Sequence, residues 1–174
     1  EALRKFFSRY GGEEWFRNSV FIFVADHVSS EKYAAKTKVS PGDYHTFGFI
    51  YAPESGLQGE CADVVSQIDI MPTLLGLMGN EQPYFAFGRD IFAAEQRQAM
   101  SVNYDNSCFQ AITADYMVRF DEQRVIGVFA REDELCEENL VGKVDVSAIE
   151  RELKAMIQSY GERIAAKNYL VTEP

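Results

Sequence analysis

The sequence lacks the features that mark several classes of protein. Its 174 residues hold no apolar run near the roughly 18 residues that a membrane-spanning helix requires. No signal peptide is visible, and the first residue is Glu1 rather than Met, which indicates a processed or cut chain. The net charge is −10, without a basic patch. This balance argues against a nucleic-acid partner, because such proteins neutralise phosphates with Lys and Arg.

Cysteine and histidine are also scarce. The three cysteines, Cys61, Cys108 and Cys136, are far apart and form no C-x-x-C pattern. This spacing excludes a zinc knuckle and a thioredoxin-like motif, and at most one disulfide can form within the chain. The redox compartment therefore stays open. The two histidines, His27 and His45, both fall in one short region, which is a mild enrichment for a site.

The remaining composition is that of an ordinary globular protein. Hydrophobic residues make up 47% and charged residues 25%. The length suits one domain with a real core, or one large piece of a bigger domain. Part of the acidic excess lies in residues 131–138. We interpret this segment as a solvated surface turn, because it has no calcium-ligand spacing.

The most informative stretch runs from residue 18 to residue 27. An apolar run, Val20 to Ala25, is long enough for one buried strand and ends in Asp26 and His27. In open α/β sheets, ligands bind outside the carboxyl ends of parallel strands. Asp offers a hard oxygen and His a neutral imidazole nitrogen, a mixed set that a borderline divalent cation accepts. An Asp-His dipeptide is common, however, and does not establish a metal site alone.

The flanking segments predict an incomplete α/β layer. Apolar residues at helical spacing predict a helix over 2–10, ended by the glycines at 11–12. A helix followed by a strand resembles the second half of a β-α-β unit whose first strand would lie upstream. A polar loop follows at 28–43, and residues 47–52 read as a second buried strand, closed by Pro53.

Residues 66–79 predict a helix with clear end signals. Asp69 is a good N-cap, Pro72 falls in the first turn where its missing N–H is harmless, and Gly79 supplies the stop. We therefore interpret the polar residues at its start as caps rather than ligands. The turn that follows, at 88–92, is expected to pack its last residue, a Phe, inward.

The pattern changes after about residue 95. Short polar turns separate four alternating segments, which predict an antiparallel meander. A long helix is expected over roughly 146–167, with capping-box spacing at Ser147 and Glu150. Its single apolar stripe predicts packing on the open face of the meander. The four predicted strands are Gln98–Tyr104, Cys108–Thr113, Tyr116–Phe120 and Arg124–Phe129.

The predicted fold class is thus α/β in two parts. Residues 1–95 form the C-terminal part of an α/β catalytic layer, and residues 96–174 form an antiparallel β-meander with a long C-terminal helix. No internal repeat or low-complexity segment is present.

Five segments in this order resemble the C-terminal half of the sulfatase / alkaline phosphatase superfamily. The resemblance is nearest to the branch of lipoteichoic acid synthases and related phosphoglycerol or phosphoethanolamine transferases. The S-Q-x-D-x-x-P-T-L-L segment is the most specific, although it holds no catalytic residue. The chain departs from the family at Val28, where Gly is usual, and at Gly48, where Pro is often found. The five segments are Ala2–Phe7, Trp15–His27, His45 eight residues before Pro53, Ser66–Leu75 and Gly88–Phe92.

The resemblance implies an alkaline phosphatase-like α/β sandwich and a site. Asp26 and His27 correspond to two metal ligands, and His45 to a histidine that contacts the transferred group or a second metal. The implied cofactor is a divalent ion: Mn, Mg or Zn, or Ca in a sulfatase. Such an ion activates a nucleophilic hydroxyl and neutralises charge on a transferring phosphoryl group. A histidine beside it can donate a hydrogen bond or protonate the leaving oxygen.

The resemblance also implies that the catalytic nucleophile, a Thr or Ser, lies upstream of Glu1 with a further carboxylate ligand. We interpret the hydroxyl residues of the polar loop as loop polarity. This chain alone is therefore expected to bind metal weakly and not to turn over substrate. The loop residues are Ser29, Ser30, Thr37 and Ser40.

Three functions remain open at this point. The first is part of a metal-dependent phosphoglycerol- or phosphoethanolamine-type transferase, or phosphoester hydrolase, acting on cell-envelope glycolipids or glycans. The second is a sulfate-ester hydrolase, and the third is a non-catalytic binding or assembly module. The expected partners are the N-terminal half of the same parent domain and a phosphate- or sulfate-ester substrate, with self-association through an exposed sheet edge. By resemblance the parent lies on the extracytoplasmic side of the membrane, with this segment itself soluble.

Overall fold

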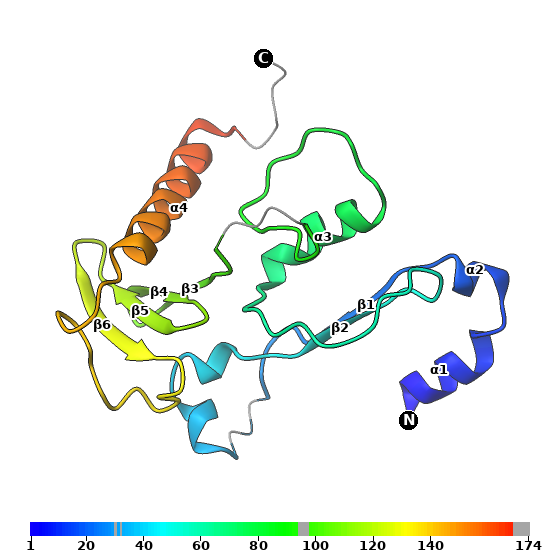
Figure 1. Ribbon diagram of the computed structural model, residues 1–174, viewed down its shortest axis with the longest axis horizontal. Coiled ribbons are helices and arrows are strands. Elements are labelled where there is room, and N and C mark those ends of the chain that lie inside the picture. Colours follow the sequence, from blue (N-terminus) through cyan, green and yellow to red (C-terminus); the bar gives the residue numbers. More distant parts are fainter. Residues whose placement is uncertain (30, 32, 94–97, 169–174) are drawn as a thin grey trace. The chain divides into compact units, whose positions relative to one another are not determined.

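A computed structural model describes residues 1–29, 31, 33–93 and 98–168 of the chain (Figure 1). The chain divides into two compact units, Glu1–Ala62 and Asp63–Pro174. It contains two antiparallel sheets and a long C-terminal helix, which confirms the predicted fold class. The predicted boundary near residue 95 falls on residues 94–97, outside the described residues. None of the described helices is long and apolar enough to cross a membrane.

The first unit is built on a two-stranded antiparallel ribbon of β1 and β2, in which Val24 lies opposite Gly48. Both predicted strands are present, but they do not run parallel to each other. The connection between them holds only short 3₁₀ turns, whereas a parallel pair requires a long crossover, usually through a helix. The unit comprises α1 (Ala2–Tyr10), α2 (Glu14–Arg17), β1 (Phe21–Val24), η1 (Ala35–Lys38), η2 (Gly42–Tyr44) and β2 (Gly48–Tyr51).

An aromatic cluster holds the two short helices against this ribbon. At its centre is Phe16, which is only 1% exposed. Its ring centroid lies 5.5 Å from that of Phe7 on α1 and 4.6 Å from that of Phe21 on β1. The Tyr51 ring of β2 lies 5.1 Å from Phe7. Because an isolated two-stranded hairpin is marginal in water, these ring contacts are the main stabilisation of the ribbon among the described residues.

The second unit contains the predicted meander, with strands in the order β3-β4-β5-β6 and every neighbour antiparallel (Figure 1). The β3–β4 connection is a two-residue turn in which Asn106 and Ser107 have φ values of 49° and 63°. Positive φ at both central residues is the hairpin turn whose twist matches that of the strands. The unit comprises η3 (Gln67–Asp69), α3 (Ile70–Leu77), β3 (Ser101–Asp105), β4 (Cys108–Ile112), β5 (Tyr116–Phe120), β6 (Val125–Ala130) and α4 (Ser147–Ala166).

Helix α4 packs on one face of this sheet, as its apolar stripe predicts. Ala111, Val118 and Leu153 are each 0% exposed and lie in the same core. Burial of large apolar side chains contributes about 1.5–3 kcal/mol each, so this interface is the main hydrophobic core of the unit. The remaining members of the core are Met100, Phe120, Val128 and Ile149.

The outer edge of β6 is covered by one side chain. Asn139 Oδ1 accepts the Val128 N–H at 3.1 Å, and its Nδ2 donates to the Ile126 carbonyl at 3.2 Å. The Leu140 N–H then donates to the Val128 carbonyl at 2.7 Å. The amide of Asn139 thus takes the place of a neighbouring strand at this edge.

Two local predictions in this unit are wrong. The expected capping box at Ser147 and Glu150 does not form; instead Asp145 Oδ1 accepts the Ser147 N–H at 2.9 Å. Val146 is the N-cap, and the Glu150 N–H donates to its carbonyl at 2.9 Å, so Ser147 lies inside the helix rather than at the cap position. Glu150 also forms an i,i+4 ion pair with Lys154 at 2.6 Å. Phe92, expected to point inward, is 47% exposed. Its backbone N–H donates to Asp90 Oδ1 at 2.9 Å, so the turn is held by polar contacts rather than by that ring.

A buried carboxylate organises the start of α3. Asp69 is 4% exposed and is the third residue of a capping box whose N-cap is Ser66. Asp69 is predicted as the N-cap, but Ser66 is the N-cap of the preceding turn and Asp69 takes part in the capping box as its N3 residue. Its Oδ2 accepts the Ser66 N–H at 2.8 Å, and its Oδ1 accepts the Arg89 N–H at 2.8 Å. The predicted stop is confirmed: Gly79 has φ 68°.

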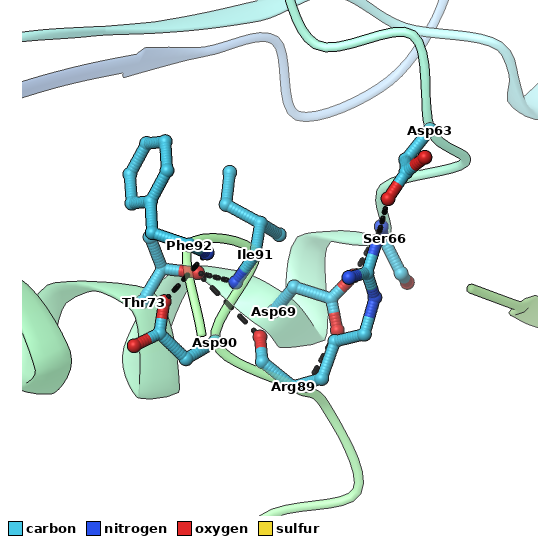
Figure 2. A network of polar contacts seen from close by, with 8 residues as sticks. All are labelled: Asp63, Ser66, Asp69, Thr73, Arg89, Asp90, Ile91 and Phe92. Atoms are coloured by element: carbon cyan, nitrogen blue, oxygen red, sulfur yellow. Dashed lines mark hydrogen bonds and ion pairs between the residues drawn. The ribbon is translucent and has the colours of Figure 1, made fainter. Parts of the chain in front are cut away.

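The same network ties three separate segments together (Figure 2). The Arg89 side chain is 7% exposed and its Nη2 lies 2.9 Å from Asp63 Oδ2. The Thr73 hydroxyl of α3 accepts the Ile91 N–H at 3.2 Å. Polar contacts therefore hold three segments together: residues 63–66, the helix α3 and the turn at 88–92.

Gly88 is required by this close approach. A Cβ at this position would overlap the Ile68 carbonyl oxygen, a backbone atom that cannot move independently. We expect Gly88→Ala to destabilise the second unit by about 1–3 kcal/mol, measured by urea unfolding followed by circular dichroism. At Gly161 on α4 an added Cβ would meet no heavy atom within 4 Å, so Gly161→Ala is the matched control. It should stabilise by about 0.4–1 kcal/mol. Equal effects of the two substitutions would contradict the packing argument.

Stability should fall in acid because of three carboxylates that accept backbone hydrogen bonds. Backbone N–H donors hold the pKa of Asp121, Asp133 and Asp145 below the usual range. A depressed folded-state pKa gives stability that is present above the unfolded pKa of about 3.9 and is lost as the pH falls through the folded value. Urea midpoints should therefore drop between about pH 5 and pH 3, and less steeply in Asp133→Asn. An unchanged slope in that variant would contradict this assignment. The backbone N–H donors are those of Arg124 and Gln123 for Asp121, of Glu138 and Glu137 for Asp133, and of Ser147 for Asp145.

Candidate functional site

The predicted metal ligands lie at one end of the β1–β2 ribbon. The Ala25 N–H donates to the Phe47 carbonyl at 3.1 Å, so pairing continues one step beyond β1. Asp26 and His27 follow directly, where the chain leaves the ribbon. Both side chains are exposed, Asp26 to 88% and His27 to 77%. The polar pair is thus presented to solvent by an apolar strand, because the strand fixes the backbone up to Ala25.

The backbone orients the His27 ring. Its Nδ1 lies 2.6 Å from the Val28 carbonyl oxygen and therefore donates a hydrogen bond to it. A neutral imidazole that carries its proton on Nδ1 keeps a lone pair on Nε2. That Nε2 lies 3.5 Å from Asp26 Oδ2, while Asp26 Oδ1 accepts the His27 N–H at 3.0 Å. The geometry leaves one oxygen and one nitrogen donor side by side.

These two donors fit a divalent cation. Two ligand atoms on one tetrahedral Zn²⁺ stand about 3.4 Å apart, given metal–ligand bonds of about 2.1 Å. The observed separation of Nε2 and Oδ2 is 3.5 Å. A backbone carbonyl also commonly accepts the remaining ring N–H of a histidine that ligates a metal. Asp26 and His27 thus stay predicted ligands that the local geometry accommodates.

His45 comes to the same end of the ribbon but does not join the pair. It follows η2, and its N–H donates to the Gly42 carbonyl at 3.2 Å. The described residues contain no group of three or more His, Cys, Asp or Glu side chains that could hold one ion. His45 is therefore no third ligand in this arrangement, and its contact with substrate stays a prediction.

The hydroxyl residues of the loop serve local turns. The Ser29 hydroxyl accepts the backbone N–H two residues further on, at 3.1 Å. The Thr37 hydroxyl donates to the Ala34 carbonyl at 2.8 Å. Ser40 is 6% exposed and thus buried. Ser30 lies outside the described residues. These contacts agree with their interpretation as loop polarity.

One component of the site was missed at the sequence level. The carbonyl of Val28 fixes the tautomer of His27. In the sequence, Val28 stands out only because Gly is usual at this position of the family. Every residue carries the same carbonyl, so the residue type holds no signal for this role. The departure from Gly therefore leaves the orienting contact in place.

Comparisons with known proteins agree with this architecture. Residues 1–80 match the model of the family described as Sulfatase. The chain is also similar to the crystal structure of a protein in the alkaline phosphatase superfamily from Vibrio parahaemolyticus, with a TM-score of 0.77 and 23% sequence identity. That match covers 98% of this chain and 41% of the other, so the chain spans about two fifths of that protein. No curated protein matches the sequence.

Residues 1–80 thus resemble the Sulfatase family, and the fold of the chain resembles that of a protein in the alkaline phosphatase superfamily. The predicted resemblance is confirmed at that level. Members of the superfamily generally use divalent metals, which agrees with the donor pair at Asp26 and His27.

The donor pair gives a direct test by metal titration. We expect Zn²⁺ to shift the imidazole NMR signals of His27 in the full chain and to leave those of His45 nearly unchanged. Asp26→Ala should weaken binding by at least about tenfold, since losing a group that only holds a ligand in place already costs about 10–100-fold. His45→Ala is the matched control and should bind as the parent chain does. A shift of His45 without one of His27 would contradict the assignment.

Proposed function

We propose that this chain is the C-terminal part of a metal-dependent phosphoglycerol- or phosphoethanolamine-type transferase, or phosphoester hydrolase, that acts on cell-envelope glycolipids or glycans. The observation that carries the proposal is the oriented donor pair, with His27 Nε2 at 3.5 Å from Asp26 Oδ2. It stands in a chain whose first 80 residues match the Sulfatase family. The branch within the superfamily rests on the resemblance of the motifs.

The cation would be held by Asp26 Oδ2 and His27 Nε2. When bound, it would supply charge neutralisation at a transferring phosphoryl or sulfuryl group and lower the pKa of a nucleophilic hydroxyl. The residues of this chain have positioning roles. Val28 fixes the ring, and the antiparallel ribbon fixes the backbone on either side of the loop. His45 would hydrogen-bond the anionic group or protonate the leaving oxygen.

The nucleophile and the remaining ligands would come from a segment upstream of Glu1. This requirement is supported by the coverage of the similar structure, of which this chain matches 41%. The high exposure of both donor side chains agrees with it, because a working metal site excludes bulk water from the reacting group. The N-terminal half of the same domain is therefore the proposed partner, on the extracytoplasmic side of the membrane.

The close alternative is a sulfate-ester hydrolase. The match to the Sulfatase family model favours it as a second candidate. The two differ in the nucleophile, which in sulfatases is a modified Cys or Ser upstream. The sequence before Glu1 is therefore the first discriminator.

Activity of the intact protein tests the proposal. We expect metal-dependent cleavage of bis(p-nitrophenyl) phosphate, and a loss of at least about 100-fold in Asp26→Ala, the scale of about 3 kcal/mol of transition-state stabilisation. Glu54→Ala removes an exposed carboxylate of the same unit and should leave activity unchanged.

Three results would overturn parts of this proposal. Full activity in Asp26→Ala would reject the site assignment. Preferential cleavage of p-nitrophenyl sulfate would favour the sulfatase. Metal binding without turnover of any ester would favour a non-catalytic binding module.

A further inference from the structure

A row of polar positions crosses the four-stranded sheet on the face turned away from α4. Asn103 of β3 lies opposite Gln110 of β4, Gln110 lies opposite Arg119 of β5, and Arg119 lies opposite Gly127 of β6. Side chains alternate between the two faces of a strand. Because Val118 packs against α4, its neighbour Arg119 points to the other face. The row therefore runs through the middle of this second face.

The row is enclosed by apolar side chains. Gln110 is 0% exposed, and Met117 and Phe129 on the same face are 2% and 7% exposed. Gly127 leaves room for the Phe129 ring, since a Cβ there would stand 2.8 Å from Cε2 of that ring. The Arg119 Cζ in turn lies 5.7 Å from the centroid of the same ring. The guanidinium thus lies within cation–π distance of the Phe129 ring, and Arg119 as a whole is partly exposed.

The hydrogen-bonding capacity of this guanidinium is unused within the described part of the chain. Arg119 Nε is a buried atom without a hydrogen-bond partner. Within the described residues, Arg119 forms no salt bridge, and its side chain donates no hydrogen bond. Gln110 Nε2 donates to Asp105 Oδ2 at 3.3 Å, so the amide of the row is engaged with a carboxylate.

The positive charge of Arg119 acts on two cysteine thiols. Burial raises the pKa of the Cys108 and Cys136 thiols, and the Arg119 charge opposes that rise at both. A partly buried charge without a hydrogen-bonded counter-ion is costly, and each unsatisfied group of this kind calls for a partner. The protein is otherwise strongly acidic, with a net charge of −10, which makes this enclosed cation a selective point for an anion.

We propose that Arg119 is the anchor of a binding site for a small tetrahedral oxyanion, phosphate or sulfate, either free or as the head group of an ester. The planar fork of a guanidinium presents paired N–H donors that match two oxygens of such an ion. The neighbouring Phe129 ring is itself buried, so the guanidinium is the group that would meet the ion. The site lies in the second unit, and its argument is independent of the function proposed for Asp26 and His27.

Calorimetric titration of the full chain with inorganic phosphate, at ionic strength held constant with NaCl, tests this site. We expect one phosphate per chain and a rise of the melting temperature on binding. Arg119→Met should weaken binding by about tenfold or more, since hydrogen bonds to charged groups contribute about 1.5–3 kcal/mol. Arg124→Met removes an exposed arginine from the neighbouring turn and should change binding less than about twofold.

Further variants separate the remaining outcomes. Arg119→Lys keeps the charge without the fork and should bind with intermediate affinity, which preserves the test if Arg119→Met fails to fold. Phenyl phosphate should bind more tightly than inorganic phosphate if an ester head group is the ligand, and equally if the free ion is. Asp26→Ala should retain phosphate binding, so failure at one site is distinguishable from failure at the other. Absence of binding by the parent chain, or equal binding by Arg119→Met, would overturn the proposal.

Discussion

The buried carboxylate of Asp69 is the contact on which the second unit depends. Its two oxygens accept N–H groups from Ser66 and from Arg89, which lie 23 residues apart in the chain. Arg89 extends the same connection to Asp63 through its side chain. A buried carboxylate is stable only when its oxygens are hydrogen-bonded, so the two segments must stay in place together. The family's most specific motif therefore serves architecture, and the chemistry lies elsewhere.

The candidate metal ligands depend on a different kind of contact. Asp26 and His27 are exposed and follow β1 directly, so their position depends on that strand. The strand is held by the rings around Phe16, which come from α1, β1 and β2. The precision with which Asp26 and His27 are positioned is consequently limited by how well an aromatic cluster fixes a two-stranded ribbon. Further strands beside this ribbon would increase that precision, which gives a structural reason for the proposed N-terminal partner.

The sequence was sufficient to predict the helices and strands whose signal is local and periodic. The helix at 2–10, the four strands and the long C-terminal helix follow from apolar spacing and turn residues, and the structure confirms them. The capping box at Ser147 failed because the N-cap of α4 is Val146, one residue before Ser147. The antiparallel pairing of β1 and β2, the Val28 carbonyl and the row at Arg119 depend on which backbone segments meet. The residue types of a single sequence do not show which backbone segments come together, so these contacts could not be predicted.

The side chain of Asn139 has a consequence for assembly. It occupies the Val128 N–H and the Ile126 carbonyl of β6, which is one of the two edge strands of the four-stranded sheet. Growth of a sheet into an open fibre needs two complementary edges on each molecule. A molecule with one available edge can join only a second copy of that edge, and the pair is then closed by a two-fold axis. Because Asn139 engages the Val128 N–H and the Ile126 carbonyl, and Leu140 engages the Val128 carbonyl, these groups of β6 cannot pair with a further strand.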